Sequence, residues 1–399
     1  MSTAPKGFRF ATACAGFRKE GRADLALLVS DVPAVAAGTF TQNRFPAAPV
    51  LVAKAMLAER PAARAVVINS GQANACTGDE GMRNCRTTQE LVASALGLEA
   101  SDILPASTGV IGAQLKMDLW EKAAPALAAN LGKATPEDFA RAIMTTDAFH
   151  KISHREVSLP GGVVKLVGMA KGAGMICPNM ATMLSVVLCD AQVEASVWQK
   201  MLRDAVELTF NRVTVDGDTS TNDMCIVLAN GMAGNTLIEW QDEEYQAFCK
   251  ALNEVNTRLA RQIAADGEGA TKLVTCTVKN SRSEEAAERL AKAVVGSNLV
   301  KAAMFGADAN WGRVLCAMGY SKAPFRPEYV SVAFESAAGS VAVCDKGAAL
   351  DFDEDLAKKV LSENEVTIAV DVNEGEDSAT AWGCDLTYDY VKINGDYRT

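Results

Sequence analysis

Short apolar runs alternate with amphipathic segments along this chain. The apolar runs at residues 66–68, 183–189 and 225–229 have the length and the β-branched content of buried strands. Between such runs, apolar residues recur with helical spacing at residues 197–210 and 243–264. Because strand-like and helical segments follow one another from end to end, the pattern predicts a mixed α/β protein.

Start and turn signals refine this pattern. Residues 135–138 combine an N-cap threonine, a proline at the first helical position and two first-turn acids, so a helix is expected from there toward Met144. Residues 160–162, Pro-Gly-Gly between two strand-like runs, predict a hairpin. Residues 151–155 read as a polar connection. Further expected elements are a polar loop at 69–74, helices at 80–96 and 284–295, and strands at 272–278, 329–334 and 366–372.

Composition narrows the class of protein. The chain has 399 residues, of which 49% are hydrophobic, enough for two or three domain-sized units with substantial cores. A formal net charge of -10 and scattered basic residues argue against nucleic acid as a partner. No apolar stretch approaches the roughly 18 residues of a membrane span, and residues 1–10 lack the apolar core of a signal peptide. We therefore expect a cytoplasmic protein without a membrane partner, and no Pro- or Ser-rich linker marks a domain boundary.

Metal-binding residue types are sparse. Eleven cysteines are dispersed, odd in number and without a Cys-x-x-Cys pair, so reduced and mostly buried thiols are expected. His150 and His154 are the only histidines, and they lie at the expected polar connection. Neither a zinc site nor a histidine-dependent triad is therefore expected.

Thr182 is the best candidate for a nucleophile. It stands between a glycine-rich segment, residues 171–174, and the apolar run that begins at Met183. A threonine inside a chain has no base of its own, but cleavage of the Ala181–Thr182 bond would place a free α-amine beside the hydroxyl. The α-amine pKa of about 7.7 to 8.0 suits a general base near neutral pH. The alternative is an ordinary β-branched residue at the start of a strand.

Two glycine-containing segments accompany this threonine. Gly109 follows Thr108 after an apolar approach, and a glycine there can expose its backbone N–H to an oxyanion; a simple turn is the alternative. Lys171 precedes a Gly-Ala-Gly run that lacks the spacing of a phosphate-binding loop or a dinucleotide fingerprint. Its ammonium suits a substrate carboxylate, and the alternative is a solvated surface lysine.

Two acidic segments raise further options. Residues 216–223 are rich in oxygen ligands, but Thr221 and Val227 replace the glycine and the glutamate that an EF-hand requires. A hydrogen-bonded turn network is expected there instead of a calcium site. Glu268 lies between two glycines just before an expected strand, from where a carboxylate can reach a cleft. A solvated turn acid is the alternative.

Several segments together resemble the glutamate N-acetyltransferase family, also called ornithine acetyltransferase, of arginine biosynthesis. One of them is the Ala-Thr-Met-Leu sequence at residues 181–184, which resembles the self-processing site of that family. Gln72 stands where the family has asparagine, and Cys177 occupies a position that is commonly small. The likeness covers essentially the whole chain, through residues 38–43, 69–78, 105–112, 211–223, 266–272 and 310–313 to the C-terminus.

This resemblance implies a fold, a maturation step and a set of site residues. The fold would be the layered α-β-β-α architecture of ornithine acetyltransferases and DmpA-like self-processing enzymes. Thr182 would cut the chain after Ala181 into an alpha chain, residues 1–181, and a beta chain, residues 182–399. Thr108 and Gly109 would form the oxyanion hole. The implied substrate-binding residues are Thr145 (or its neighbour Thr146), Lys171, Thr182, Glu268, Asn394 and Thr399.

The implied reaction moves the acetyl group of N-acetylornithine to glutamate through an acetyl-Thr182 intermediate, without a metal or an organic cofactor. Acetyl-CoA is compatible as a second acetyl donor, although no separate motif for it is legible. The implied assembly is a heterotetramer of two alpha and two beta chains. Two other functions fit parts of the pattern: a self-processing aminopeptidase or amidohydrolase, and a non-catalytic small-molecule-binding protein with a structural glycine loop.

Overall fold

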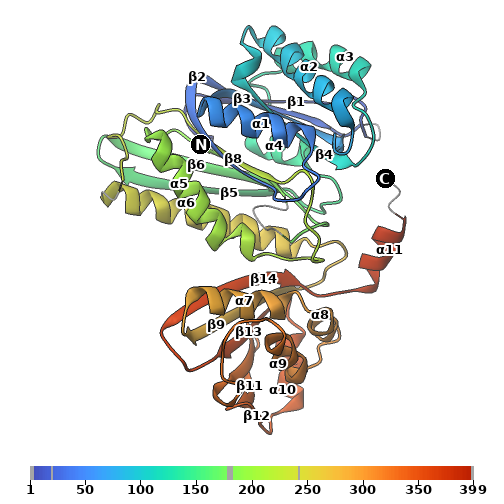
Figure 1. Cartoon of the computed structure of the whole chain (residues 1–399), viewed down its shortest axis with the longest axis vertical. Coiled ribbons are helices and arrows are strands. Elements are labelled where there is room, and N and C mark those ends of the chain that lie inside the picture. Colours follow the sequence, from blue (N-terminus) through green and yellow to red (C-terminus); the bar gives the residue numbers. More distant parts are fainter. Residues whose placement is uncertain (1–3, 19–20, 178–182, 241–242, 397–399) are drawn as a thin grey trace.

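The computed structural model describes residues 4–18, 21–177, 183–240 and 243–396. In this described part the chain forms two units, each built on its own β-sheet (Figure 1). The strands of the larger unit are β1 (Phe8–Ala13), β2 (Leu25–Phe40), β3 (Ala62–Gln72), β4 (Ile103–Val110), β5 (Lys151–Leu159), β6 (Gly162–Lys171), β7 (Leu184–Cys189) and β8 (Met224–Ala229). Its helices are α1 (Ala48–Glu59), α2 (Gly78–Leu96), α3 (Met117–Ala129), α4 (Pro136–Ala142), α5 (Ala195–Leu208) and α6 (Glu243–Ala265).

The long strand β2 joins the two halves of the larger sheet, whose order is β4-β3-β2-β8-β7-β6-β5 with β1 paired to β2 outside this path. Residues 25–30 of β2 pair with β1, and residues 25–29, 34 and 35 pair with β3, whereas residues 35–40 pair with β8. The register with β3 shifts between Val29 and Ala34. The strand therefore passes from one group of partners to another, and the two groups form two layers.

Alternating side chains along the strands fill a core on each face of both layers. Leu28 of the first layer and Val186 of the second belong to one core between the layers. On its outer face the first layer packs through Leu27 against α2 and α3. The second layer packs through Val187 against α5 and α6. The resulting order of helix, sheet, sheet and helix (Figure 1) confirms the predicted mixed α/β class and its layers.

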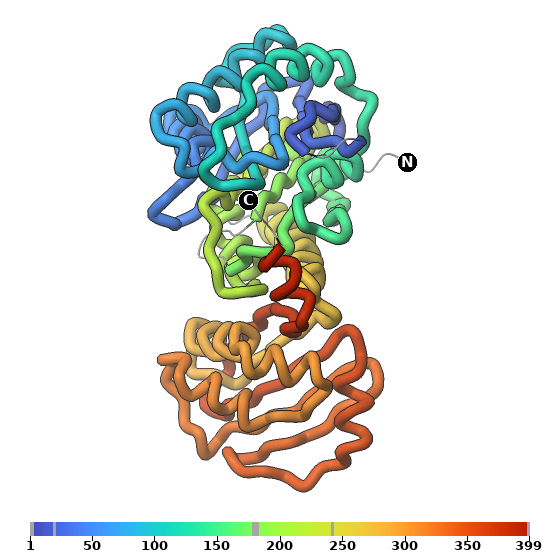
Figure 2. The backbone as a smooth tube through the Cα atoms, turned by 90° about the vertical axis from the view of Figure 1, so that its right-hand side faces the viewer, coloured from blue at the N-terminus to red at the C-terminus, as the bar shows by residue number. Residues whose placement is uncertain are grey.

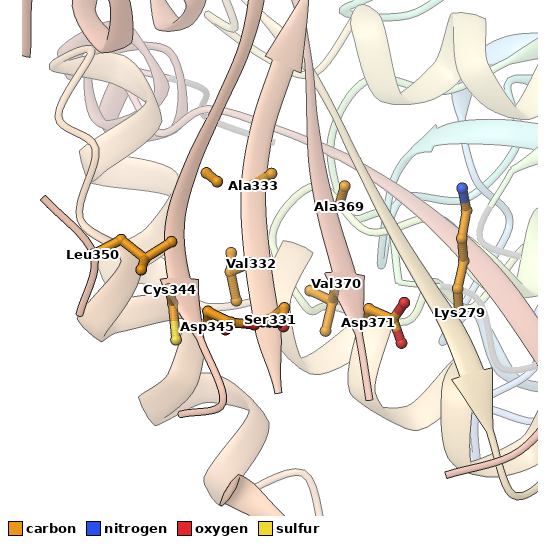
Figure 3. A pocket seen from close by; sticks show the side chains of 11 residues that line it. Lys279, Ser331, Val332, Ala333, Cys344, Asp345, Leu350, Ala369, Val370 and Asp371 are labelled. Atoms are coloured by element: carbon orange, nitrogen blue, oxygen red, sulfur yellow. Dashed lines mark hydrogen bonds between the residues drawn. The ribbon is translucent and has the colours of Figure 1, made fainter. Parts of the chain in front are cut away.

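The smaller unit is a six-stranded sheet with the order β12-β11-β10-β13-β9-β14. Its helices cover one face, where Phe334 and Ile368 belong to its core. The other face carries the shallow hollow of about 400 Å³ in Figure 3, where Ala333 and Ala369 lie side by side. Its elements are β9 (Leu273–Ser281), α7 (Glu284–Val295), α8 (Asn298–Phe305), α9 (Trp311–Gly319), β10 (Ser331–Ser336), β11 (Gly339–Asp345), β12 (Ala348–Ala349), α10 (Glu354–Leu361), β13 (Glu365–Asp371) and β14 (Asp377–Cys384).

Two segments connect the units. α6 ends at Ala265, and β9 of the smaller unit begins only a few residues later. After β14, α11 (Tyr388–Asp396) runs back along the waist of the molecule toward the larger unit (Figure 2). Thr387 Oγ1 donates to the carbonyl of Gly269 at 2.7 Å, which fixes the start of α11 against the first connection.

Most expected elements lie close to their predicted bounds. α7 has the predicted bounds, and α4 follows Thr135, whose hydroxyl accepts from the Asp138 amide in a capping box. The predicted connection at residues 151–155 is wrong, because these residues open β5 and pair with β6. The predicted loop at residues 69–74 starts too early, since β3 continues through Gln72.

Candidate active site

Predicted site residues gather where three strands of the larger unit meet. β6 ends at Lys171, which pairs with Leu184 at the start of β7. Leu184 also pairs with Met224 at the start of β8. Met224 N donates to Met183 O at 3.0 Å. The chain that follows position 182 is thus held between β6 and β8, with Lys171 on one side.

Lys171 contacts the opposite layer. The residue is only 9% exposed, and its Nζ donates to Thr108 Oγ1 on β4 at 3.2 Å. Burial lowers the pKa of Lys171, against the opposing effect of Asp147. The alternative of a solvated surface lysine is therefore wrong, and the two layers contribute an ammonium and a hydroxyl to one place.

Gly109 is required by its surroundings. It pairs with Gly71 of β3 and has a φ of 132°, a conformation that side chains disfavour. A Cβ at this position would lie 2.2 Å from the carbonyl carbon of Gly71 and 2.6 Å from the amide nitrogen of Gln72. Gly109 therefore belongs to the end of a strand rather than to a simple turn, directly beside Thr108.

Thr145 lies in the loop that follows α4. Its amide donates to Asp147 Oδ2 at 2.8 Å, and Arg18 Nη2 donates to its carbonyl at 2.8 Å. Asp147 Oδ1 accepts from Gly172 N at 2.6 Å, next to Lys171. A single carboxylate therefore holds the Thr145 loop and the end of β6 together.

Glu268 approaches from the connection between the units. Its amide donates to the carbonyl of Ala173 at 2.9 Å, so it lies against the glycine-rich segment after Lys171. Its Oε2 accepts from Asn394 Nδ2 on α11 at 2.8 Å. The alternative of a fully solvated turn acid does not describe this residue, because two distant segments contact it.

Asp223 is a buried carboxyl group to which the sequence interpretation gave no role of its own. It directly precedes β8, is 2% exposed, and its Oδ2 has no hydrogen-bond partner among the described residues. Burial raises the pKa of Asp223 well above its usual range, although Lys171 opposes this.

The hydrogen-bonded turn network that was predicted at residues 216–223 is confirmed, since Asp216 accepts from Met175 N at 2.7 Å and Ile176 N at 2.8 Å.

The sequence interpretation also missed a buried ion network beside Thr145. Lys151, in the segment that was expected to be a polar connection, is wholly buried and contacts Asp147 and Asp266. Residues 153–156 after it are polar, and Asp266 lies far away in the sequence, so no local pattern marked its burial.

Three of the predicted residues, Ala181, Thr182 and Thr399, lie outside the described residues. The structure does bring together Lys171 and Thr108, with Gly109 next to Thr108, and it joins Glu268 to Asn394. Thr145 is linked to the end of β6 through Asp147. The described predicted residues thus come from both layers of the larger unit, from the connection and from α11.

Three general features concern metal binding, membrane crossing and the cysteines. The described residues form no cluster of three or more His, Cys, Asp or Glu side chains that could hold a metal ion. None of the described helices has both the length and the apolar character needed to cross a membrane. Six of the eleven cysteines are buried, as expected.

The fold and these residues define a layered α/β protein with a polar site where β4 and β6 end and β7 begins. The chain belongs to the ArgJ family, whose model matches residues 9–399. The predicted family is thereby confirmed, and so is the predicted class of enzyme, an acyltransferase of arginine biosynthesis.

Curated relatives match over the full length. The chain is 57% identical over 400 residues to the arginine biosynthesis bifunctional protein ArgJ of Nitratidesulfovibrio vulgaris, covering 100% of both chains. It is 48% identical over 396 residues to the protein of the same name from Thermotoga neapolitana, covering 99% of each.

Solved structures match over part of the chain. The crystal structure of the arginine biosynthesis bifunctional protein argJ from Bacillus halodurans is 42% identical and has a TM-score of 0.49, covering 52% of this chain and 96% of that one. Ornithine acetyltransferase from Mycobacterium tuberculosis, complexed with ornithine, is 38% identical with a TM-score of 0.40, covering 45% of this chain and 95% of that one.

Proposed function

We propose that this chain is a self-processing enzyme that moves the acetyl group of N-acetylornithine to glutamate through an acetyl-Thr182 intermediate. Membership of the ArgJ family supports the reaction class. The observation that carries the proposal is the contact of Lys171 Nζ with Thr108 Oγ1 at 3.2 Å, beside the strand that begins just after position 182. A buried cation and a hydroxyl from two layers thus lie next to the start of β7.

Maturation begins with attack of the Thr182 hydroxyl on the carbonyl carbon of Ala181. The peptide C–N bond breaks, the nitrogen becomes the free α-amine of Thr182, and an ester links the two residues. Water then hydrolyses the ester, which gives a carboxylate on Ala181 and restores the Thr182 hydroxyl. The products are an alpha chain, residues 1–181, and a beta chain, residues 182–399. Pairing of β6 with β7 and of β2 with β8 keeps the two chains associated.

Transfer uses the same hydroxyl twice. In the first half, Thr182 attacks the acetyl carbonyl of N-acetylornithine, its proton passes to the α-amine, and the C–N bond breaks as that proton moves to the departing ornithine. In the second half, the neutral amine of glutamate attacks the acetyl-threonine ester, the ester C–O bond breaks, and the amine proton passes to the Thr182 oxygen as N-acetylglutamate leaves. Thr108 and Gly109 stabilise the oxyanion of each tetrahedral intermediate.

Charge complementarity assigns the substrate contacts. The buried ammonium of Lys171 binds a substrate carboxylate, because a desolvated cation attracts an anion more strongly than a solvated one does. Glu268 binds a substrate amine, and Asn394 orients the Glu268 carboxylate through their 2.8 Å hydrogen bond. Thr145, held by Asp147, and the C-terminal Thr399 complete the proposed binding set.

Partners and location follow from the same proposal. Ornithine, N-acetylornithine and glutamate are the small-molecule partners, and acetyl-CoA is a further acetyl donor if the enzyme is bifunctional like its named relatives. Two alpha and two beta chains form a heterotetramer in the cytoplasm. The proposed acetyl transfer requires neither a metal nor an organic cofactor.

Product analysis tests this function against hydrolysis. Purified protein is incubated with N-acetylornithine, with and without glutamate, and ornithine, acetate and N-acetylglutamate are quantified. The proposal predicts N-acetylglutamate in equal amount to ornithine when glutamate is present. Acetate as the main product in both samples would indicate an amidohydrolase, and no ornithine in either sample would indicate a binding protein.

A further inference from the structure

A buried ion network links three segments of the proposed site. Lys151, at the start of β5, is fully buried, and its Nζ lies 2.7 Å from Asp147 Oδ1 and 2.5 Å from Asp266 Oδ2. Asp147 lies in the loop after α4, and Asp266 directly follows α6. One ammonium therefore bridges Asp147 and Asp266, which lie 119 residues apart in the sequence.

Each carboxylate also holds backbone next to a proposed substrate contact. Asp147 accepts from the amides of Thr145 at 2.8 Å and Gly172 at 2.6 Å. Asp266 accepts from Ala148 N at 3.2 and 3.1 Å, and it stands two positions before Glu268. The loop of Thr145, the strand end of Lys171 and the connection of Glu268 thus meet at these three side chains.

We propose that Asp147, Lys151 and Asp266 are positioning residues, which set the distances among the segments that carry Thr145, Lys171 and Glu268. This inference rests on the proposed function, because those three residues are its substrate contacts. The network touches no substrate. It acts by fixing backbone amides, so that both substrates meet a preorganised set of charges.

The energetics favour a positioning role over simple stabilisation. Removing ions from water is unfavourable before they pair, and apolar packing of the same volume is often as stable. Ion pairs that also accept hydrogen bonds from backbone amides fix the orientation of the segments they join, which apolar packing does not do. With Lys171, the cluster contains two cations and two carboxylates. Although burial alone would raise it, Lys171 and Lys151 hold the pKa of Asp147 well below its usual range.

The first test replaces Asp147 by asparagine. Asp147→Asn keeps the size but removes the charge and one of the two acceptor oxygens, so the Thr145 and Gly172 amides are no longer both held. We expect the KM of N-acetylornithine and of glutamate to rise about tenfold or more, with a smaller change in kcat. Cleavage is checked by mass and folding by circular dichroism before the kinetics are compared.

Asp190→Asn is the matched control. Asp190 is also fully buried and accepts from two backbone amides, Lys6 N at 3.0 Å and Lys165 N at 2.7 Å. It follows the far end of β7, about 20 Å from Leu184 at the usual rise per residue. We expect this variant to lose thermal stability to a similar extent while both KM values stay within about twofold of the wild type.

A second variant tests the proposal independently of whether Asp147→Asn folds. Lys151→Met together with Asp266→Asn removes one charge of each sign, so Asp147 keeps Lys171 as its counter-ion and its own amide contacts. The ammonium bridge to Asp266 is lost, together with the contacts of Lys151 Nζ with Asp147 and with the Phe149 carbonyl. We expect a larger rise in KM for N-acetylornithine, whose free amine meets Glu268, than in the Asp190→Asn control.

The outcomes separate the two proposals. Raised KM values in the Asp147 and double variants, with an unaffected control, support the positioning role. KM values in both that equal those of the control would overturn it while leaving the proposed function intact. A wild-type protein that forms no N-acetylglutamate would refute the proposed function and, with it, the positioning role that depends on it.

Discussion

The carboxylate of Glu268 lies directly against Gly174. A Cβ built on this glycine would be 2.3 Å from Glu268 Cδ and 2.4 Å from each carboxylate oxygen. The glycine-rich segment after Lys171 therefore serves a purpose besides flexibility: it leaves room for an acid that arrives from the connection between the units.

Gly174→Ala should displace Glu268 and weaken substrate binding. The backbone at Gly174 does not need a positive φ, so the added methyl group acts by its volume. We expect KM for N-acetylornithine to rise by about tenfold, with a loss of stability of about 1 kcal/mol. Steady-state kinetics measure this, with Gly319→Ala as control, because nothing lies within 4 Å of a Cβ at Gly319. Equal KM values in the two variants would refute the role of Glu268.

Thr108→Val tests the oxyanion hole. Valine keeps the shape of threonine but removes the hydroxyl that contacts Lys171 Nζ. Losing one donor to a developing oxyanion costs about 100- to 1000-fold in kcat, and we expect a fall of that order with a small change in KM. Thr108→Ser should retain most of the activity. Gly109 is a poorer choice for this test, since its φ of 132° and its contact with Gly71 make any substitution a folding defect.

A pH dependence follows from Lys171. Burial lowers the pKa of its ammonium, which Asp147 partly restores. Below that pKa the ammonium carries the charge that we propose binds the substrate carboxylate; as the pH rises through it, the charge is lost. KM for glutamate should therefore increase at a pH below the 10.5 of an ordinary lysine.

Lys171→Arg supplies the comparison for this titration, because a guanidinium stays protonated throughout. Its KM for glutamate can be higher than that of the wild type, but it should not rise between pH 7 and about pH 10. The same alkaline rise in both proteins would assign the titration to another group.

The C-terminal helix gives a further prediction. Asn394→Leu removes the hydrogen bond to Glu268 Oε2 and should raise KM for N-acetylornithine by about three- to tenfold. Deletion of Thr399 should have an effect of the same kind if the C-terminus reaches the substrate. Lys392→Ala, at an exposed position of α11, is the control and should leave KM unchanged. An unchanged KM for N-acetylornithine in Asn394→Leu would show that Asn394 of α11 does not contribute to substrate binding.

Elements with a strong local pattern were predictable. The amphipathic spacing of α7 and the capping box of Thr135 determine those helices within a few neighbouring residues. The two layers of the larger unit were expected only from the family resemblance. Two or three domain-sized units were expected, but the boundary between them was not predicted, because no Pro- or Ser-rich linker separates α6 from β9.

The sequence predicted a set of candidate site residues, but not how they are arranged. Lys171 and Thr108 are 63 positions apart, and Glu268 and Asn394 are 126 apart, so no local pattern pairs them. Lys151 was misread because polar residues in a short segment usually face solvent. Its burial depends on Asp266, 115 positions away, whose carboxylate compensates the buried charge.

Denaturing intact-mass spectrometry after brief exposure to N-acetylornithine tests directly whether Thr182 is both the cleavage site and the acetyl carrier. We expect two chains that meet between Ala181 and Thr182, with one acetyl group added to the chain that begins with Thr182. Thr182→Ala should remain uncut and unacetylated. A wild-type protein that stays a single 42.1 kDa chain without an acetyl group would rule out both roles of Thr182.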